Sequence, residues 1–513
     1  MRTVKTLQRV LQNVEVSKTL GRLDVLLSGM AYDSRKVRKG DLFVAVRGVK
    51  HDGHQHIAQA LRNGAAAVVA EELSWEPSSE TAVLVPHTRR ALPVLSANFY
   101  DHPSRRLCLV GVTGTNGKTT TTLLLEGILK EAGFKVGVIG TLAYRWNGRE
   151  LSAPMTTPES LDLQALLHEM LQDGVTHVLM EVSSHALVLG RVDACTFKAG
   201  VFTNLSQDHL DFHETMEAYF AAKAMLFKEI LPAGGDGFVA VINGDDPFGS
   251  RLSQFLESGL WTFGVSAGDL TVRAHRVELG GRGIRALFSM PGMEMEVASP
   301  LLGRLNLYNL LCAAATSLAL GVKPGDIQGG LKKISHVSGR LQQVPVPEDY
   351  DGVVVVDYAH TPDALEKTLE CLREMTRGRL WVVFGCGGDR DRRKRPLMGQ
   401  VAARFGDLVV LTSDNPRSEV PELILRDIEA GIKMERMPLL DADDFFTGAK
   451  GYMMEVDRRK AIHFVLSRAK PYDVILIAGK GHETYQLVGD QVLPFDDREV
   501  VMSYFNSMKR RVS

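Results

Sequence analysis

The feature that most constrains the fold of this chain is a glycine-containing loop between an apolar segment and a helical one. Residues 107–112 (LCLVGV) have the unbroken apolar character of a buried strand, and residues 121–133 have the spacing of a helix. A second apolar run, residues 135–142, follows at once. Strand, loop, helix and strand in this order predict a βαβ unit, because the helix carries the chain back so that two strands can pair in parallel.

The loop itself has the composition of a phosphate-binding loop. Backbone amides at a helix N-terminus point toward phosphate oxygens, a lysine adds a compact positive charge, and a threonine hydroxyl can hold Mg²⁺. The general G-x-x-x-x-G-K pattern would need glycine at position 112, where this chain has Val112. The loop is therefore a variant, with an ordinary glycine-rich turn as the alternative. We predict that ATP contacts Gly114, Thr115, Asn116, Gly117, Lys118, Thr119 and Thr120.

The length of 513 residues corresponds to three or four domains. Short apolar runs before residue 104 predict a small N-terminal α/β domain, residues 1–104. Apolar runs at 175–182, 199–205 and 237–244 extend the βαβ unit into a central P-loop ATPase-type α/β domain, residues 105–335. A second alternating set of strands and helices from residue 352 predicts a doubly wound, Rossmann-like C-terminal domain, residues 336–513. The expected fold class is α/β with three domains.

Charge and cysteine content limit the compartments and partners that we expect for this chain. The 60 Lys and Arg residues balance 61 Asp and Glu residues, so the net charge provides no general attraction to nucleic acid or to an anionic membrane. No apolar run approaches 18 residues, and the five cysteines are scattered without Cys-x-x-Cys spacing. We expect a cytoplasmic chain that neither inserts into membranes nor binds nucleic acid, and we treat it as a monomer.

Several polar residues after the loop could bind a metal. Glu181 ends an apolar run and could face nucleotide-bound Mg²⁺, a cation that prefers oxygen ligands. His209, Asp211 and His213 have spacing that could bind a metal, although such residues in a polar loop are often only solvated. Lys223 lies in an otherwise apolar helical stretch, where a lone lysine usually extends to the surface.

The C-terminal half offers a second group of candidates. Arg340, Asp357 and His360 lie where the second α/β set begins, at positions from which a further domain could close over ATP. Arg390 and Arg417 follow strand-like runs and carry guanidinium groups suited to bidentate carboxylate recognition, although each alone is typical of a surface charge. Gly385 and Gly387 do not complete a dinucleotide motif, since its third glycine would stand at Arg390.

Together these motifs resemble the Mur ligase superfamily, which includes the folylpolyglutamate synthetases. The resemblance rests on DSRKVRKGDLFVAVRG (33–48), TGTNGKTTT (113–121), TTPES (156–160), EVSSHAL (181–187), TNLSQDHLDFH (203–213), DNPR (414–417) and GKGHE (479–483). It implies three domains and ATP-driven amide formation through an acyl phosphate. Among members of the superfamily, the motifs look most like those that add meso-diaminopimelate to UDP-N-acetylmuramoyl-L-alanyl-D-glutamate in peptidoglycan biosynthesis.

The resemblance also implies roles for individual residues. Lys223 would be carbamylated and would hold a second Mg²⁺ together with His209, so that the catalytic residues are Lys118, Lys223 and His209 and the metal ligands are Thr119, Glu181, His209 and the carbamate of Lys223. Asn306 would contact adenine, with Arg340 and Asp357 completing the ATP site. The UDP-muramoyl-dipeptide would be held by Ser34, Thr156, Thr157, Ser183 and Arg191, and diaminopimelate by Arg390, Asp414, Asn415, Pro416, Arg417, Gly479 and Glu483.

One position departs from the family pattern, and three other functions stay open. Relatives resembling the enterobacterial enzymes carry glutamine two residues before the arginine of the donor site, where this chain has Leu189, so that contact is expected to be absent or replaced. The alternatives are a lysine-adding member, a folylpolyglutamate synthetase-like ligase, and a nucleotide-dependent switch that performs no ligation.

Overall fold

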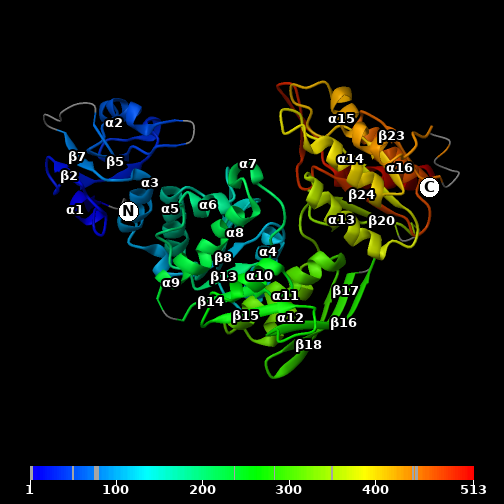
Figure 1. Cartoon of the computed structure of the whole chain (residues 1–513), viewed down its shortest axis with the longest axis horizontal. Coiled ribbons are helices and arrows are strands. Elements are labelled where there is room, and N and C mark those ends of the chain that lie inside the picture. The colour runs from blue at the N-terminus through cyan, green and yellow to red at the C-terminus, as the bar shows by residue number, and fades with distance from the viewer. Residues whose placement is uncertain are drawn as a thin grey trace. The chain divides into compact units, whose positions relative to one another are not determined.

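In the computed structural model, the described residues form two compact units (Figure 1). These residues are 4–48, 51–73, 80–235, 237–281, 283–347, 350–441, 444 and 449–512. The first unit comprises Met1–Leu205, His209–Val272 and Cys312–Gly330, and the second comprises Ser206–Asp208, Arg273–Leu311 and Leu331–Ser513. The N-terminal and central sheets both belong to the first unit. The domain boundaries at residues 104 and 335 stay predictions.

The N-terminal part of the first unit is a five-stranded sheet with helices on both faces. Its strand order is β2-β7-β6-β5-β4, with β2 (Lys18–Leu20), β4 (Gly29–Ala31), β5 (Asp41–Val44), β6 (Ala67–Ala70) and β7 (Thr81–Leu84). Successive side chains of β5 point to opposite faces. Leu42 and Val44 therefore share a core with α3 (Thr88–Phe99), while Phe43 shares one with α2 (Ile57–Arg62). The flanking elements are β1 (Lys5–Thr6), α1 (Leu7–Val10) and β3 (Leu26–Leu27).

The central sheet of the first unit contains the predicted βαβ segment. Its strand order is β11-β10-β9-β12-β8-β13-β14-β15. The bounds are β8 (Cys108–Thr113), β9 (Val136–Ile139), β10 (Ala143–Trp146), β11 (Arg149–Ser152), β12 (His177–Glu181), β13 (Ala199–Phe202), β14 (Val239–Asn243) and β15 (Leu260–Gly264). Neighbouring strands from β9 to β15 pair in parallel, and β10 and β11 add an antiparallel edge. The predicted parallel unit is confirmed.

The order of these strands places the phosphate loop where the connections between strands diverge. The chain leaves β8 for β9 and β12 on one side, and later returns to pair β13 on the other side of β8. The connections after neighbouring strands therefore diverge at the carboxyl end of β8, which is where open α/β sheets bind ligands. The helices of this layer are α4 (Lys118–Glu131), α5 (Ser160–Gln172), α6 (Ser184–Val188), α7 (Leu210–His213), α8 (Met216–Met225), α9 (Leu231–Ala233) and α10 (Pro247–Ser253).

The second unit contains a six-stranded sheet of order β19-β20-β24-β21-β22-β23. Its strands are β19 (Gln342–Gln343), β20 (Val353–Asp357), β21 (Leu380–Phe384), β22 (Leu408–Leu411), β23 (Gly451–Met454) and β24 (Val474–Ala478), all parallel to their neighbours except β19. One face packs on α13 (Pro362–Met375), α14 (Lys394–Phe405) and α15 (Pro421–Met434), and the other on α16 (Arg458–Arg468) and α17 (Asp497–Val512). Helices on both faces confirm the doubly wound prediction.

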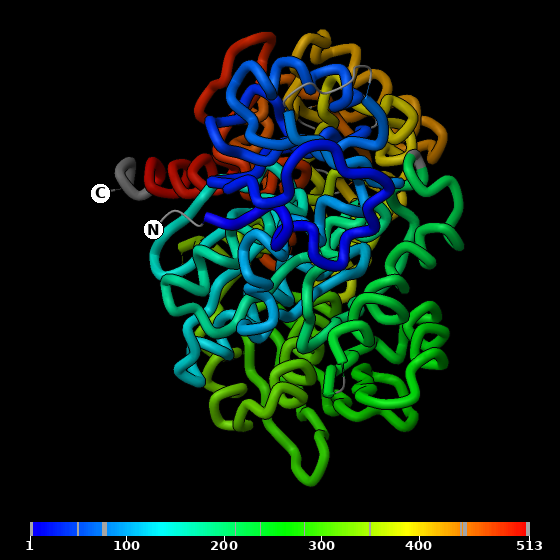
Figure 2. Tube along the Cα trace, turned by 90° about the vertical axis from the view of Figure 1, so that its left-hand side faces the viewer, coloured from blue at the N-terminus to red at the C-terminus, as the bar shows by residue number. Residues whose placement is uncertain are grey.

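The remaining elements are hairpins and connecting helices. In the second unit, β17 (Gly283–Met290) pairs antiparallel with β16 (Val272–Gly280) and β18 (Met293–Ser299), and β25 (Tyr485–Val488) pairs with β26 (Gln491–Pro494). Figure 2 shows α17 as a continuous coil at the C-terminal end. The helices α11 (Gly303–Ala319) and α12 (Pro324–Lys333) follow β18. Within the described ranges no helix is long and apolar enough to cross a bilayer. All five cysteines are free thiols.

Candidate functional site

The phosphate loop connects β8 to the first turn of α4, as the sequence predicts. Gly114 has φ +144° and Gly117, which precedes the helix, has φ +86°. These conformations favour glycine, and a Cβ at Gly114 would in addition collide with the Thr203 hydroxyl. The loop is braced by the segment after β13, since Asn204 accepts from the Asn116 amide at 2.9 Å and its backbone carbonyl accepts from the Thr115 amide at 2.9 Å. Thr203 and Asn204 belong to the TNLSQDHLDFH motif, but their bracing role was not predicted.

Two lysines reach the same carbonyl of this loop. Lys118 Nζ donates to the carbonyl oxygens of Gly114 and Thr115, each at 2.9 Å. Lys223 Nζ donates to the Gly114 carbonyl at 3.0 Å and lies 4.6 Å from the centroid of the Tyr219 ring. The Lys223 side chain is only 1% exposed, so it does not extend into solvent as a lone surface lysine would. The structure therefore brings both predicted lysines to the phosphate loop.

A buried carboxylate joins the loop to the neighbouring strands. Glu181, at the end of β12, is 2% exposed and accepts from the Thr119 hydroxyl at 3.0 Å. It also accepts from the hydroxyl of Thr141 at 2.9 Å and from its amide at 3.1 Å. Carboxylate and hydroxyl oxygens suit Mg²⁺, so the Thr119 and Glu181 pair fits the predicted metal role. Thr141 was not predicted, and as an isolated threonine in a loop it carried no signal.

The predicted second metal position lies among aromatic rings. The rings of His209 and His185 are 5.0 Å apart, and His209 adopts φ +52° immediately before α7. His213 is buried and its Nε2 lies 2.9 Å from the Ser184 hydroxyl, which gives this residue a structural partner. The side chain of Asp211 lies outside what the structure describes. Among the residues searched within the described ranges, no three His, Cys, Asp or Glu side chains are grouped to hold a metal ion.

Four of the five predicted donor-site residues lie close together. Thr157 donates its hydroxyl to the Glu181 carbonyl at 2.8 Å and accepts from the Ser183 amide at 3.1 Å. Arg191 donates to the Thr157 carbonyl at 3.0 Å. The Thr156 hydroxyl lies 3.1 Å from that of Thr141, which links this cluster to Glu181. A carboxylate missed by the sequence analysis, Glu159, accepts from Arg89 at 2.6 Å and lies 3.7 Å from Arg191.

The fifth donor-site residue is separate from this cluster, and the unusual residue 189 provides no substitute. Ser34 lies in a short 3₁₀ helix (Ser34–Lys36) of the N-terminal part and donates to Gln59 Oε1 at 2.9 Å. Leu189 directly follows α6 and is half-buried. Its aliphatic side chain cannot make the polar contact that a glutamine would make, so the expected absence of that contact stands as a prediction.

The predicted nucleotide contacts in the second unit are held by local bonds. Asn306 lies inside α11 and donates to the Leu302 carbonyl at 2.9 Å. Asp357, at the end of β20, accepts from the amides of Leu341 and Ala359 at 2.6 and 2.9 Å. Desolvation raises the pKa of Asp357, and the Arg340 guanidinium opposes this shift. The bond from the Leu341 amide ties Asp357 to the residue that follows Arg340.

The two predicted amino-acid motifs meet at the carboxyl edge of the second sheet. Asn415 donates to Glu483 Oε2 at 2.9 Å, and Lys480 Nζ donates to the same oxygen at 2.9 Å. Gly479 has φ +111°, and a Cβ there would collide with the Asp414 carboxylate. Lys480 is fully buried and was missed, although it stands inside the GKGHE motif.

The arginines of this region lie near one another. Arg417 has φ +50° and donates to the Gly388 carbonyl at 2.8 Å. Its backbone pairs with the β25–β26 hairpin, because its amide donates to Leu487 at 3.1 Å. Arg390 is exposed and its Cγ approaches Gly387, the same glycine that Arg417 approaches. The two guanidinium groups thus lie near the same glycine, and Asn415, two residues before Arg417, bonds Glu483. Side chains of both signs of charge in one region suit the carboxylate and ammonium groups of an amino acid.

Comparison with known proteins matches three parts of the chain to one family. Residues 26–100 match the Mur ligase family catalytic domain, residues 112–317 the Mur ligase middle domain, and residues 339–481 the Mur ligase glutamate ligase domain. A Geobacter metallireducens protein named UDP-N-acetylmuramoyl-L-alanyl-D-glutamate--2,6-diaminopimelate ligase is 45% identical over 97% of this chain and 98% of its own. A Gloeobacter violaceus protein of the same name is 45% identical over 95% and 96%.

Solved structures agree with these matches. A structure of a UDP-N-acetylmuramoyl-L-alanyl-D-glutamate--2,6-diaminopimelate ligase has 32% identity and a TM-score of 0.72, covering 99% of both chains. The MurF ligase from Thermotoga maritima, solved with ADP, has 21% identity and a TM-score of 0.60, covering 94% and 98%. At that identity the second likeness shows the fold alone. Together these likenesses confirm the three-domain α/β fold class.

Proposed function

The chain belongs to the Mur ligase family and is an ATP-dependent ligase that forms an amide bond, and we propose that it joins meso-diaminopimelate to UDP-N-acetylmuramoyl-L-alanyl-D-glutamate in peptidoglycan biosynthesis. The observation that carries the choice of amino acid is the meeting of the DNPR and GKGHE segments. Arg417 supplies a guanidinium for a carboxylate, and Glu483 supplies a carboxylate for an ammonium. Diaminopimelate differs from lysine by one carboxylate, so a guanidinium is the group expected to distinguish them.

The first step of the reaction uses the phosphate loop. The side-chain carboxylate of the donor glutamate attacks the γ-phosphorus of ATP, the bond to ADP breaks, and an acyl phosphate forms. Lys118 and the amides at the start of α4 stabilise the negative charge on the phosphate oxygens. Thr156, Thr157, Ser183 and Arg191 orient the donor, and their links to Glu181 hold them beside the loop.

In the second step the amine at the L-centre of diaminopimelate attacks the acyl carbon. A tetrahedral species forms and then releases phosphate, and the nitrogen loses a proton to give the amide. The second-unit residues Arg390, Asp414, Asn415, Pro416, Arg417, Gly479 and Glu483 orient the incoming amino acid.

Magnesium belongs to the proposal as well. Thr119, Glu181, His209 and a carbamylated Lys223 would hold it, and when bound it neutralises charge on the phosphates. The geometry at Gly114 supports the carbamate, because Lys118 and Lys223 both donate to that one carbonyl. Two ammonium groups so close repel each other, and converting the buried one into an anionic carbamate replaces repulsion with attraction.

The compartment, the oligomeric state, the partners and the remaining ATP contacts are proposals as well. We place the chain in the cytoplasm as a monomer, with its two small-molecule substrates as partners and with Asn306, Arg340 and Asp357 completing the ATP site. The five free cysteines, four of them buried, are consistent with a reducing compartment.

Phosphate release tests the proposed function. With ATP and the UDP-muramoyl-dipeptide present, we expect release only when meso-diaminopimelate is added, and little release with lysine, glutamate or alanine. A signal with lysine alone would make the chain a lysine-adding member. ATP hydrolysis that no substrate stimulates would instead indicate a nucleotide-dependent switch.

A further inference from the structure

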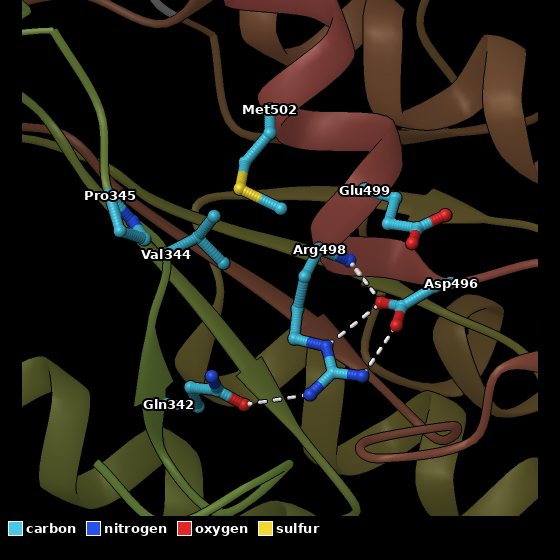
Figure 3. A pocket seen from close by; sticks show the side chains of 7 residues that line it. All are labelled: Gln342, Val344, Pro345, Asp496, Arg498, Glu499 and Met502. Atoms are coloured by element: carbon cyan, nitrogen blue, oxygen red, sulfur yellow. Dashed lines mark hydrogen bonds and ion pairs between the residues drawn. The ribbon is translucent and has the colours of Figure 1, made fainter.

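Arg498, near the start of α17, reaches Asp496 and Gln342 (Figure 3), and Gln342 lies at the end of the turn that contains Arg340. Its Nε donates to Asp496 Oδ1 at 2.9 Å, and its Nη2 donates to the other oxygen of the same carboxylate. The remaining nitrogen, Nη1, donates to Ser338 Oγ at 2.9 Å and lies 3.5 Å from Gln342 Oε1. One planar guanidinium therefore joins the start of α17 to both ends of residues 338–342.

The turn receives further support on the side of Gln342. Gln342 Oε1 accepts from the Gly339 amide at 2.9 Å, so Arg498 acts on an acceptor that also fixes the turn's backbone. Gly339 has φ +64°, and its carbonyl accepts from the Tyr358 amide at 2.9 Å. The residues on both sides of Arg340 are thus fixed, and its guanidinium lies 4.9 Å from the centroid of the Tyr358 ring.

The turn is also packed against the GKGHE segment. A Cβ at Gly339 would collide with the His482 amide, and a Cβ at Gly481 would lie 2.6 Å from Tyr358 Cβ. A displacement of residues 338–342 therefore cannot be absorbed by moving toward Gly481. On another side of the turn, Arg498 bonds Ser338 and lies close to Gln342.

The ion pair that orients Arg498 is permanently charged near neutral pH. Its hydrogen bond to Asp496 raises the pKa of the arginine, and the same bond lowers the pKa of Asp496 against the opposing effect of burial. Lysine could keep the attraction to Asp496. It could not contact Asp496 and Ser338 at once with the fixed geometry of a guanidinium fork.

Arg498 lines a pocket at the start of α17. The pocket has a volume of about 250 Å³ and is lined by Gln342, Val344, Pro345, Asp496, Arg498, Glu499 and Met502 (Figure 3). The Arg498 side chain is 20% exposed, so it is not part of a closed core and its shortening should cost little packing.

We infer that Arg498 is a positioning residue that fixes Arg340 for ATP through Ser338 and Gln342, without itself contacting the nucleotide. The inference rests on the proposed function, in which Arg340 contacts ATP. It predicts that the effect of Arg498 is specific to ATP and that it depends on Arg340.

The test is a kinetic double-mutant cycle on the full chain with Arg340→Ala, Arg498→Ala and the combined variant. Arg498→Ala should raise the KM for ATP about tenfold, the size expected for hydrogen bonds to a charged group, while the KM for diaminopimelate stays within about twofold. In the Arg340→Ala background, Arg498→Ala should change the KM for ATP less than about twofold.

Arg498→Lys should melt like wild type and still show the raised KM for ATP. Glu499→Gln, which alters the same pocket, is the matched control and should match wild type.

Effects of Arg340→Ala and Arg498→Ala that simply multiply would overturn the inference, as would equal increases in both KM values. If Arg340→Ala binds ATP like wild type, the inference fails together with the role of Arg340. Ligation by the wild-type chain in the same assay would then leave the proposed function intact.

Discussion

The phosphate loop of the first unit and the amino-acid loops of the second recognise charge in different ways. The phosphate loop is one consecutive segment in which glycines allow backbone amides to approach phosphate and Lys118 adds a compact charge. The amino-acid loops join residues 414–417 to residues 479–483, and their side chains meet only because β22 and β24 end at the same edge of one sheet. In the proposed function, the first region serves chemistry that the family shares, and the second selects the amino acid.

The largest effect is expected at the phosphate loop. Lys118→Ala should abolish measurable ligation, a loss on the order of 10³-fold in kcat, because it removes positive charge where negative charge develops. The fold should survive, since the side chain bonds its own loop and fills no core. Lys130→Ala is the matched control, because Lys130 lies on the same helix with its side chain 59% exposed. Activity of Lys118→Ala near the wild-type rate would show that this segment is not a phosphate loop.

The next largest effect separates the two lysines that share the Gly114 carbonyl. Lys223→Ala should reduce kcat about 10²-fold by removing a metal ligand, and added short carboxylic acids should restore part of the activity. Lys228→Ala serves as the control, because its ammonium lies over the Phe255 ring at 3.8 Å. An unmodified Lys223 amine in a high-resolution map of the Mg²⁺-loaded enzyme would contradict the carbamate.

In the amino-acid loops we expect a substitution to change the KM for diaminopimelate, whereas in the phosphate loop it lowers kcat. Arg417→Ala should raise the KM for diaminopimelate on the order of tenfold or more, since paired hydrogen bonds to a carboxylate contribute about 1.5 to 3 kcal/mol each. The KM for ATP should stay nearly constant, which steady-state kinetics at saturating ATP can check. Arg393→Ala, at a side chain that is 87% exposed, is the control. Equal increases in both KM values would remove the distinction between the two regions.

The smallest effect is expected at the ion pair between Arg395 and Glu419, which lies two residues after the DNPR segment. The hydrogen bond from the fully buried Arg395 side chain lowers the pKa of Glu419 to about 2, below the usual value near 4.3 for glutamate. Because the pKa of Glu419 is lower in the folded chain than in the unfolded chain, its ionised form stabilises the fold at pH values above the unfolded pKa. This contribution is lost as the pH falls from about 5 toward 2. Glu419→Gln should therefore reduce the free energy of unfolding by about 1 to 3 kcal/mol at pH 7. Denaturant titrations should show this difference closing toward pH 2, and a constant difference would contradict the assignment.

The sequence predicted consecutive features well and distant pairings only in part. The strand, loop and helix around Lys118 were predictable because local periodicity and glycine placement determine them. The likeness to a family supplied DNPR and GKGHE as motifs, but it did not show that Lys480 links Asn415 to Glu483. Thr141 and Arg498 were missed because an isolated threonine or arginine has no distinctive spacing, and their partners are far away in the sequence.

The most direct test of the account is a competition between two amino acids. The wild-type chain is given ATP, the UDP-muramoyl-dipeptide and an equimolar mixture of meso-diaminopimelate and lysine, and the mass of the nucleotide product is measured. The account predicts a product carrying diaminopimelate with little of the lysine product, because a lysine would leave the Arg417 guanidinium without a carboxylate partner. Equal amounts of both products, or mainly the lysine product, would contradict the assignment of the amino-acid loops.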